Sequence, residues 1–378
     1  MKISWAQCAM VGSLTLTTVA GCTSSGSQVP NVAFNAIQQP NVRGGHLPKP
    51  SAQMIELTNR AHITPMVHLN RRGSWIKPEV RRMKYLLYVS DEASGTVDVY
   101  AYRTKPGRLL GQLTGFQFPY GECTDKSGNV YVADFAAADI VEYAHGGTTP
   151  IKTLTDSYGY PIGCSVDPTT GNLAVANFEG VGSTCMGGVV IYEGATGGGT
   201  LYQDQDLSYY YPPGYDASGN LYVQGQTANG AAGLAELGSG SADLVTLSLS
   251  GATISYPGSM QWDSHYMTAT DQSYQGGTLS GIYRISVSGT QASVVDSTVL
   301  SDECLKGSTP YNDVVQPFIN STVWPTHRVV GGNLYCTYRT NFWIYVKRHH
   351  LIGGEPKRSL PYDAAPELAA GQTISPMQ

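Results

Sequence analysis

Residues 118–134 read FPYGECTDKSGNVYVAD and carry three structural signals in a fixed order. An aromatic residue precedes Pro119, an Asp-x-x-Gly-Asn segment runs from Asp125 to Asn129, and the run VYVAD follows at 130–134. Gly and Asn adopt the positive φ angles that a tight hairpin needs, and alternating apolar residues are typical of a β-strand. The stretch therefore predicts two antiparallel strands joined by a short turn.

The same pattern recurs at intervals of 42 to 51 residues, with one longer interval before the last copy. The further copies are YPIGCSVDPTTGNLAVAN (160–177), YPPGYDASGNLYV (211–223), YPGSMQWDSHYMTATD (256–271) and WPTHRVVGGNLYCT (324–337), and LYVSD (87–91) ends an opening copy. Four short strands per unit of about 45 residues are typical of a propeller blade. We therefore predict an all-β fold, a six-bladed β-propeller of four-stranded antiparallel blades. A seventh blade would need a copy hidden in the stem or in the Ser/Thr-rich insertion 286–322.

These repeats resemble NHL-type repeats and, more broadly, the SMP-30/gluconolactonase and YncE-like propellers, over about residues 85–350. Such propellers host binders, lactonases and lyases, so the resemblance implies architecture more than activity. The likeness to the lactonases implies a divalent cation such as Ca²⁺ in the channel, with Glu122, Asn177 and Asp271 as oxygen ligands and Asp134 as a further candidate. The Glu-Gly-Pro signature of that family is absent. The alternative for Glu122 is a solvated carboxylate at the channel mouth.

The first 22 residues are typical of a bacterial lipoprotein signal. Lys2 is followed by about 15 uncharged, mostly apolar or small residues that end in Val-Ala-Gly-Cys at 19–22. A helix needs ~20 apolar residues to span a bilayer, so this stretch suits a signal peptide better. We expect cleavage before Cys22, acylation of Cys22, and a lipid-anchored protein of the cell envelope. The resemblance to the proteobacterial sorting pattern, with Thr23 rather than Asp after the cysteine, implies the outer membrane. An ordinary secretory signal is the alternative.

Charge divides the chain into unlike parts. Residues 43–84 carry nine Lys or Arg against two Glu, whereas from residue 85 onward 13 basic residues stand against 26 acidic ones. The basic stem would lie on anionic lipid headgroups or fold over the acidic body. The net charge of −5 argues against a nucleic-acid-binding role. The expected segments are a signal peptide (1–21), a flexible stem (22–74), the propeller (75–354) and a loose tail (355–378), with a strand at 75–79 closing the ring.

Five cysteines follow Cys22, and an oxidising compartment would allow two disulfides and one thiol. Two of them, Cys123 and Cys164, occupy nearly the same place in consecutive repeats and are a candidate pair. The other candidate pair is Cys304 with Cys336, which leaves Cys185.

Aromatic residues precede Pro in five repeats and are expected around one end of the channel, where they either wedge between blades or bind a ligand. The candidate ligand-binding residues at this end are Tyr120, Tyr209, Tyr210 and Trp324. Nothing in the chain matches a nucleophile elbow, a phosphate-binding loop or a zinc motif. The predicted function is a binding or scaffold module for a protein, peptide or glycan partner. Catalysis is left open, the alternative being a divalent-metal-dependent hydrolase or lyase of the SMP-30 kind.

Overall fold

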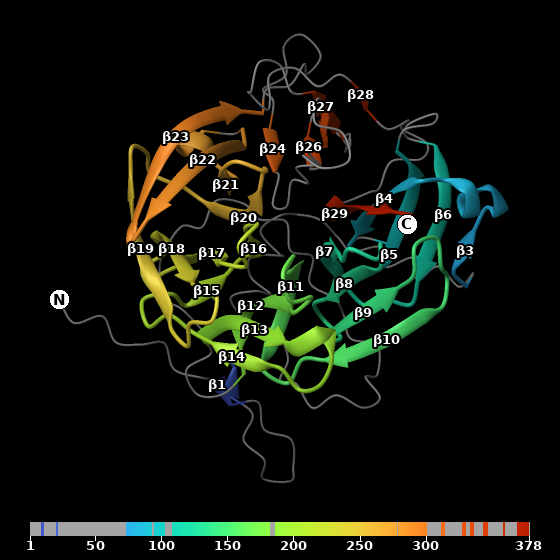
Figure 1. The fold of residues 1–378 in the computed structure, drawn as a ribbon, viewed down its shortest axis with the longest axis horizontal. Helices are drawn as coiled ribbons and strands as arrows, with labels where there is room; N and C mark the ends of the chain where they lie inside the picture. Colours follow the sequence, from blue (N-terminus) through green and yellow to red (C-terminus); the bar gives the residue numbers. More distant parts are fainter. Residues whose placement is uncertain are drawn as a thin grey trace.

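The structure, a computed structural model, describes residues 73–92, 94–102, 108–181, 186–277, 279–300 and 369–377. Antiparallel sheets stand like sectors of a disc around a central axis (Figure 1). This arrangement is a β-propeller, so the predicted all-β fold class is confirmed. Among the described residues, no helix is long and apolar enough to cross a membrane.

Five blades are formed by the described residues. The first contains β29 (Ala369–Pro376), β4 (Tyr85–Asp91), β5 (Thr96–Ala101), β6 (Leu109–Thr114) and β3 (Trp75–Ile76), in this order from the axis outward. The second contains β7 (Pro119–Thr124), β8 (Val130–Asp134), β9 (Asp139–Tyr143) and β10 (Pro150–Thr155). The third contains β11 (Gly159–Val166), β12 (Leu173–Gly180), β13 (Met186–Tyr192) and β14 (Thr200–Tyr202).

The fourth and fifth blades share one continuous sheet. The fourth contains β15 (Tyr209–Tyr210), β16 (Gly214–Tyr215), β17 (Leu221–Gln226), β18 (Ala232–Leu237) and β19 (Leu244–Ser250). The fifth contains β20 (Pro257–Trp262), β21 (Met267–Asp271), β22 (Gly281–Ser288) and β23 (Gln291–Val299). Their outer strands, β19 and β23, pair in parallel over three residues, which joins the two blades at the rim.

The remaining elements are short 3₁₀ helices and short strands. The described residues also contain three short 3₁₀ helices: η1 (Pro78–Arg82), η2 (Glu193–Ala195) and η3 (Tyr274–Gly276). The backbone of further short strands pairs in three small sheets: β1 (Ala9–Met10), β2 (Ala20–Gly21), β24 (Tyr311–Asp313), β25 (His327–Val329), β26 (Asn333–Tyr335), β27 (Trp343–Val346) and β28 (Arg358–Ser359). The sixth blade stays a prediction, because most of residues 301–368 lie outside the described part of the chain, Trp324, Cys304 and Cys336 among them.

The predicted hairpin turns are confirmed, and their side chains explain the repeat motif. The Asp125 carboxylate accepts hydrogen bonds from the backbone and side-chain nitrogens of Asn129, at 2.8 and 2.9 Å. Gly128 takes the positive φ of 83° that the turn requires. In the fourth blade Asp216 binds Asn220 in the same way, and the Asn220 side-chain oxygen accepts the Ser239 N–H of the next hairpin at 2.9 Å. The motif therefore stabilises two successive turns.

The ring is closed differently from the prediction. The expected closing strand near residue 75 is β3, which pairs with β6 on the outer edge of the first blade. The inner strand of that blade is the C-terminal β29, so the expectation of a loose tail is wrong for 369–376. Residues 372–375 are at most 2% exposed, because they fill the space between β4 and β7. Without β29, the edge of β4 would be left unpaired.

The candidate disulfide between Cys123 and Cys164 is confirmed. It joins β7 to β11, the inner strands of neighbouring blades, with a Cα–Cα distance of 5.5 Å. Cys185 lies outside the described residues.

Candidate functional site

The two ends of the disc are distinguished by strand direction. At one end, here called the entry face, the inner strands begin and the second strands finish, as the pairs Pro119–Asp134 and Pro257–Asp271 show. At the opposite end, the exit face, the inner strands finish in the Asp/Asn turns. Each candidate side chain can be placed with respect to these two faces.

Glu122 does not face the channel as a solvated carboxylate. It lies on β7 and is only 2% exposed, and its Oε1 accepts the Ser90 hydroxyl at 2.7 Å. Burial, with a smaller contribution from the Asp98 charge, raises the pKa of the Glu122 carboxyl well above its usual range, although hydrogen bonds from Ser90 and the Thr373 backbone oppose the shift. Because Ser90 belongs to β4 and Thr373 to β29, Glu122 ties the second blade to the first. The alternative of a solvated carboxylate at the channel mouth is therefore wrong, and Glu122 makes an inter-blade contact.

The other two proposed metal ligands also have structural roles. The Asp271 carboxylate accepts the backbone N–H groups of Ser255 and Tyr256 at 3.0 and 2.9 Å, which fixes the start of β20. The Asn177 amide donates to Asp156 at 3.1 Å. No group of three His, Cys, Asp or Glu side chains in the described residues is arranged to hold a metal ion. Glu122, Asn177 and Asp271 belong to the second, third and fifth blades, and each is hydrogen-bonded to groups of the protein.

Asp134 repeats the role of Asp271 in the second blade. Its two oxygens accept the N–H groups of Gln117 and Phe118 at 2.8 and 2.7 Å. Burial raises the pKa of Asp134 to about 6, and hydrogen bonds from the backbone of Phe118, Gln117 and Ala137 limit the rise. An acidic residue at the end of the second strand therefore holds the aromatic-Pro segment in place at the entry face.

The aromatic rings of this segment pack between blades. Tyr160 stacks on Phe135 of the preceding blade at 5.3 Å, and Tyr211 meets the edges of Phe178 and Tyr256 at 5.6 and 6.0 Å. These contacts form one continuous apolar cluster through the second to fifth blades. The aromatic residues before Pro that the structure describes therefore pack between blades, which is one of the two arrangements expected from the sequence.

The expected exposure of two candidate ligand-binding tyrosines is wrong. Tyr120 is 2% exposed and packs on Phe118, and Tyr210 is fully buried with its hydroxyl against the Asp204 backbone. Tyr209 is partly buried and lies 5.0 Å from the ring of Phe178. These rings are buried because aromatic side chains fill the space between neighbouring sheets, where they pack in one apolar cluster.

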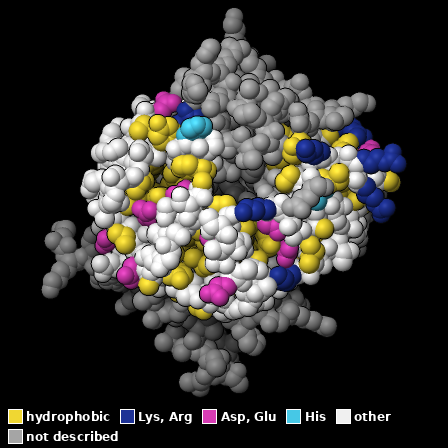
Figure 2. Space-filling model, viewed as in Figure 1, with side chains coloured by type: hydrophobic (Ala, Val, Ile, Leu, Met, Phe, Trp, Pro, Cys, Tyr) yellow, Lys and Arg dark blue, Asp and Glu magenta, His cyan; other side chains and the backbone are white. Residues whose placement is uncertain are grey.

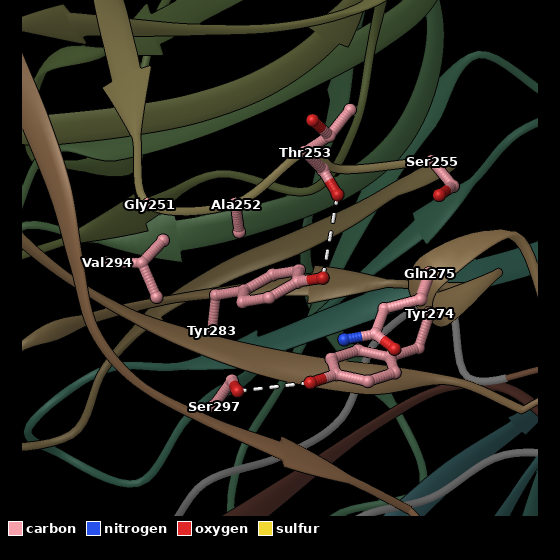
Figure 3. A pocket seen from close by; sticks show the side chains of 9 residues that line it. All are labelled: Gly251, Ala252, Thr253, Ser255, Tyr274, Gln275, Tyr283, Val294 and Ser297. Carbon is pink, nitrogen blue, oxygen red and sulfur yellow. Dashed lines mark hydrogen bonds between the residues drawn. The ribbon is translucent and has the colours of Figure 1, made fainter.

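A pocket that sequence reasoning did not find opens at the entry face of the fifth blade. Its volume is about 370 Å³, and Figure 3 shows its walls. The pocket lies between the loop that leads into β20, the η3 turn, and strands β22 and β23. It is lined by Gly251, Ala252, Thr253, Ser255, Tyr274, Gln275, Tyr283, Val294 and Ser297, none of which is charged.

Two tyrosines form the aromatic part of this pocket. The rings of Tyr274 and Tyr283 stack at 5.3 Å with an interplanar angle of 26°. The Tyr274 hydroxyl lies 3.0 Å from the Ser297 hydroxyl, and the Tyr283 hydroxyl donates to the Thr253 carbonyl at 3.5 Å (Figure 3). Burial raises the pKa of Tyr283 to about 12, so its hydroxyl group stays protonated and the side chain is neutral at physiological pH. The site offers aromatic surface and neutral hydrogen-bonding groups.

Gly281 allows the Tyr274 ring to take this position. A Cβ atom at residue 281 would overlap the Tyr274 ring. The sequence signal for the pocket was a longer connection between the second and third strands of the fifth blade. This connection, between β21 and β22, contains the segment Ser273–Gly277, whereas the second blade has only a short turn after Asp134 at the same place. That segment contains Gln275, a non-glycine residue with a φ of 54°.

A second pocket of about 250 Å³ lies at the exit face between the third and fourth blades. Two carboxylates, those of Asp167 and Glu193, line it. Asp167 accepts hydrogen bonds from the backbone and hydroxyl of Thr169 and from the hydroxyl of Thr170. These hydrogen bonds hold the pKa of Asp167 below its usual range against the effect of burial. Asp167 is therefore a turn former, as its place in the repeat predicted.

Comparison with known proteins supports the fold without naming a family. No family model matches the chain, and no curated protein does either. A chain of the solved nidogen/laminin complex is similar in structure, with a TM-score of 0.53 and 14% sequence identity, over 78% of this chain and 99% of that one. At this identity the likeness shows the fold alone, a β-propeller. The resemblance to propellers is thus confirmed, whereas no match supports the NHL, SMP-30 or YncE-like families in particular.

Proposed function

We propose that this protein is a lipid-anchored β-propeller of the bacterial cell envelope that works as a binding or scaffold module. The observation that carries the binding role is the uncharged pocket at the entry face, where the stacked Tyr274 and Tyr283 adjoin hydroxyl and carbonyl groups. Such a surface suits a neutral partner rich in hydroxyl or amide groups, such as a glycan or a peptide segment. The similar solved chain comes from a complex between two proteins, which supports the use of this fold in binding.

The lipid anchor in this proposal rests on the Val-Ala-Gly-Cys segment at 19–22. Two or three acyl chains on Cys22 would hold the protein firmly at a membrane, where one chain would be marginal. In bacterial cells, Cys22→Ser is expected to remove the acyl mass and to move most of the protein out of the membrane fraction. Unchanged mass and unchanged fractionation would contradict the anchor.

The pocket is tested by binding to arrays of neutral oligosaccharides and uncharged peptides. Tyr274→Ala removes half of the aromatic stack and is expected to weaken binding at least tenfold. The matched control is Tyr266→Ala, because Tyr266 is 39% exposed on the exit-face turn of the same blade. Binding that survives Tyr274→Ala, or that is lost equally in the control, would exclude the pocket as the binding site.

A melting experiment separates this proposal from the metal-dependent hydrolase. Saturation of a micromolar Ca²⁺ site at millimolar Ca²⁺ would add roughly 4 kcal/mol to the free energy of unfolding. We expect the same Tm in Ca²⁺ and in EDTA, since Glu122 and Asp271 already bind protein groups. A rise of several degrees in Ca²⁺ would favour the alternative.

A further inference from the structure

Basic side chains gather around η1, at the outer edge of the first blade. Figure 2 shows Lys and Arg side chains clustered where Figure 1 places β3 and the start of β4. Three of them, Arg81, Arg82 and Lys84, are exposed. The acidic residue of the segment, Glu79, is bound by Arg108 at 2.8 Å. The basic rim, defined as Lys77, Arg81, Arg82, Lys84 and Arg108, therefore keeps a surplus of positive charge.

The element that carries this rim is firmly attached to the propeller. Val80, in the middle of η1, is 1% exposed and packs against Gly146. A Cβ atom added to Gly146 would lie only 2.6 Å from a methyl carbon of Val80. The Lys77 backbone N–H donates to the Leu110 carbonyl at 2.7 Å. The imidazole of His145 contacts the Met83 carbonyl at 2.9 Å. Arg81 and Arg82 therefore project from a fixed support rather than from a free stem.

Strand direction places the rim near the exit face. Lys84 directly precedes β4, a second strand, and second strands start at the exit face. A backbone hydrogen bond from the Met377 N–H to the Lys84 carbonyl supports this placement. Met377 follows the end of the inner strand β29, and inner strands end at the exit face. The Tyr274 pocket opens at the entry face, so the rim and the pocket lie at opposite ends of the disc.

Charge and chain order point to a membrane as the partner of this rim. The chain from residue 85 onward carries 13 basic against 26 acidic residues, so an anionic surface repels most of the body and attracts the rim. The rim also follows directly on the stem that begins at Cys22. Trp75, which is 37% exposed beside it, has the side chain that favours the boundary between lipid headgroups and water.

We propose that the basic rim binds the phosphate groups of an anionic lipid surface and thereby turns the entry face away from the membrane. The lipid anchor of the proposed function supplies the setting, but the contact itself does not depend on acyl chains. The rim orients a tethered propeller so that its pocket remains accessible to a partner. Each Lys or Arg near such a surface contributes about 1 kcal/mol, or about fivefold in affinity, so three exposed charges are enough to select one orientation.

The test uses the chain from residue 22 onward with Cys22→Ser, the form left by the expected cleavage but without acyl chains. Its binding to vesicles of phosphatidylglycerol and phosphatidylcholine is compared with binding to phosphatidylcholine alone by sedimentation. We expect preference for the anionic vesicles, a loss of more than tenfold in Arg81→Gln/Arg82→Gln, and a loss in 0.5 M salt. Equal binding to both vesicles, or full binding by the double variant, would overturn the proposal.

Two controls separate charge from structure. Arg81→Lys/Arg82→Lys keeps both charges and is expected to bind as the parent chain does, so a loss in this variant would also count against the proposal. Lys152→Gln removes one charge from the second blade, where Lys152 lies 3.5 Å from Glu142, and is expected to change binding less than Arg82→Gln does. Because all of these measurements omit the acyl chains and the partner, they can fail while the pocket and the anchor stand.

Discussion

His145 Nδ1 lies 2.7 Å from the hydroxyl oxygen of Ser375, a residue 230 positions later in the chain. The other ring nitrogen of His145 contacts the carbonyl of Met83, and a carbonyl only accepts, so Nε2 carries a hydrogen. Burial lowers the pKa of this imidazole. One side chain of the second blade thus contacts both the start of the first blade and the C-terminal strand that completes it.

The closing strand is expected to be essential for cooperative folding. Ile374 is 2% exposed on β29, so Ile374→Ala should lower the free energy of unfolding by about 2–4 kcal/mol. Ile374→Val, which leaves a much smaller cavity, should cost about 1 kcal/mol. Thermal and urea unfolding of the two variants measure the difference. If both variants melt with the parent chain, β29 does not close the ring.

The disulfide is expected to stabilise the contact between the second and third blades. Cys123 and Cys164 are 41 residues apart, and closing a loop of that length in the unfolded chain corresponds to about 4 kcal/mol in the chain-entropy description. Cys123→Ala/Cys164→Ala should therefore melt several degrees below the parent chain without reductant. Identical melting of the double variant and the parent would argue against the bond.

Asp134 is expected to hold the start of β7 through its two backbone hydrogen bonds. Asp134→Ala leaves the buried N–H group of Phe118 and the partly buried N–H group of Gln117 without this acceptor, at a cost of about 2–4 kcal/mol. Amide hydrogen exchange should speed up at these two positions before the rest of the blade is affected. The exposed turn residue Asp243 gives the control Asp243→Asn, for which no change is expected. Unaltered protection at residues 117 and 118 would show that the segment is held by other contacts.

The buried carboxyl group of Asp98 is expected to make the free energy of unfolding depend on pH. Burial, reinforced by the charge of Asp91, raises the pKa of Asp98 from 3.8 to about 7, even though Gln112 and Tyr100 donate hydrogen bonds to it. Between pH 4 and pH 7 the folded chain therefore keeps a proton that the unfolded chain releases. The contribution of this group to stability is present below pH 4 and is lost as the pH rises toward 7.

Asp98→Asn removes this titration. Relative to the variant, the parent chain should lose on the order of 3 kcal/mol between pH 4 and pH 7.5. Urea unfolding of both chains at the two pH values measures the loss. Parallel pH profiles for the parent and Asp98→Asn would contradict a raised pKa at this position.

Local chemistry explains which features could be predicted from the sequence. The Asp125–Asn129 turn depends on residues within five positions of one another, so its hydrogen bonds follow from the motif alone. The repeat then places equivalent positions side by side in successive blades. For this reason Cys123 and Cys164 were a candidate disulfide pair from the sequence, and the structure contains the bond. Repeat spacing and alternation were likewise sufficient for the propeller fold.

The candidate site depended on contacts that no local pattern contains. Glu122 reads as a channel carboxylate from its place in the repeat, but its partners Ser90 and Thr373 lie 32 and 251 residues away. The pocket of Tyr274 and Tyr283 exists because the loop before β20 packs beside η3 and β23. A sequence shows that a tyrosine is present, whereas its exposure depends on which side chains of the neighbouring blades pack against it.

The sequence by itself determined the repeating strand-and-turn unit, the blade architecture and the basic character of the segment before residue 85, and it offered Cys123 and Cys164 as a candidate disulfide pair. Each of these rests on residues close together in the chain or on exact repetition. Only the tertiary structure decided that β29 completes the first blade, that Tyr120 and Tyr210 are buried, and that the basic rim and the Tyr274 pocket lie at opposite ends. These outcomes depend on how the ring closes, because closure brings together strands that are hundreds of residues apart and sets which side chains fill the space between blades.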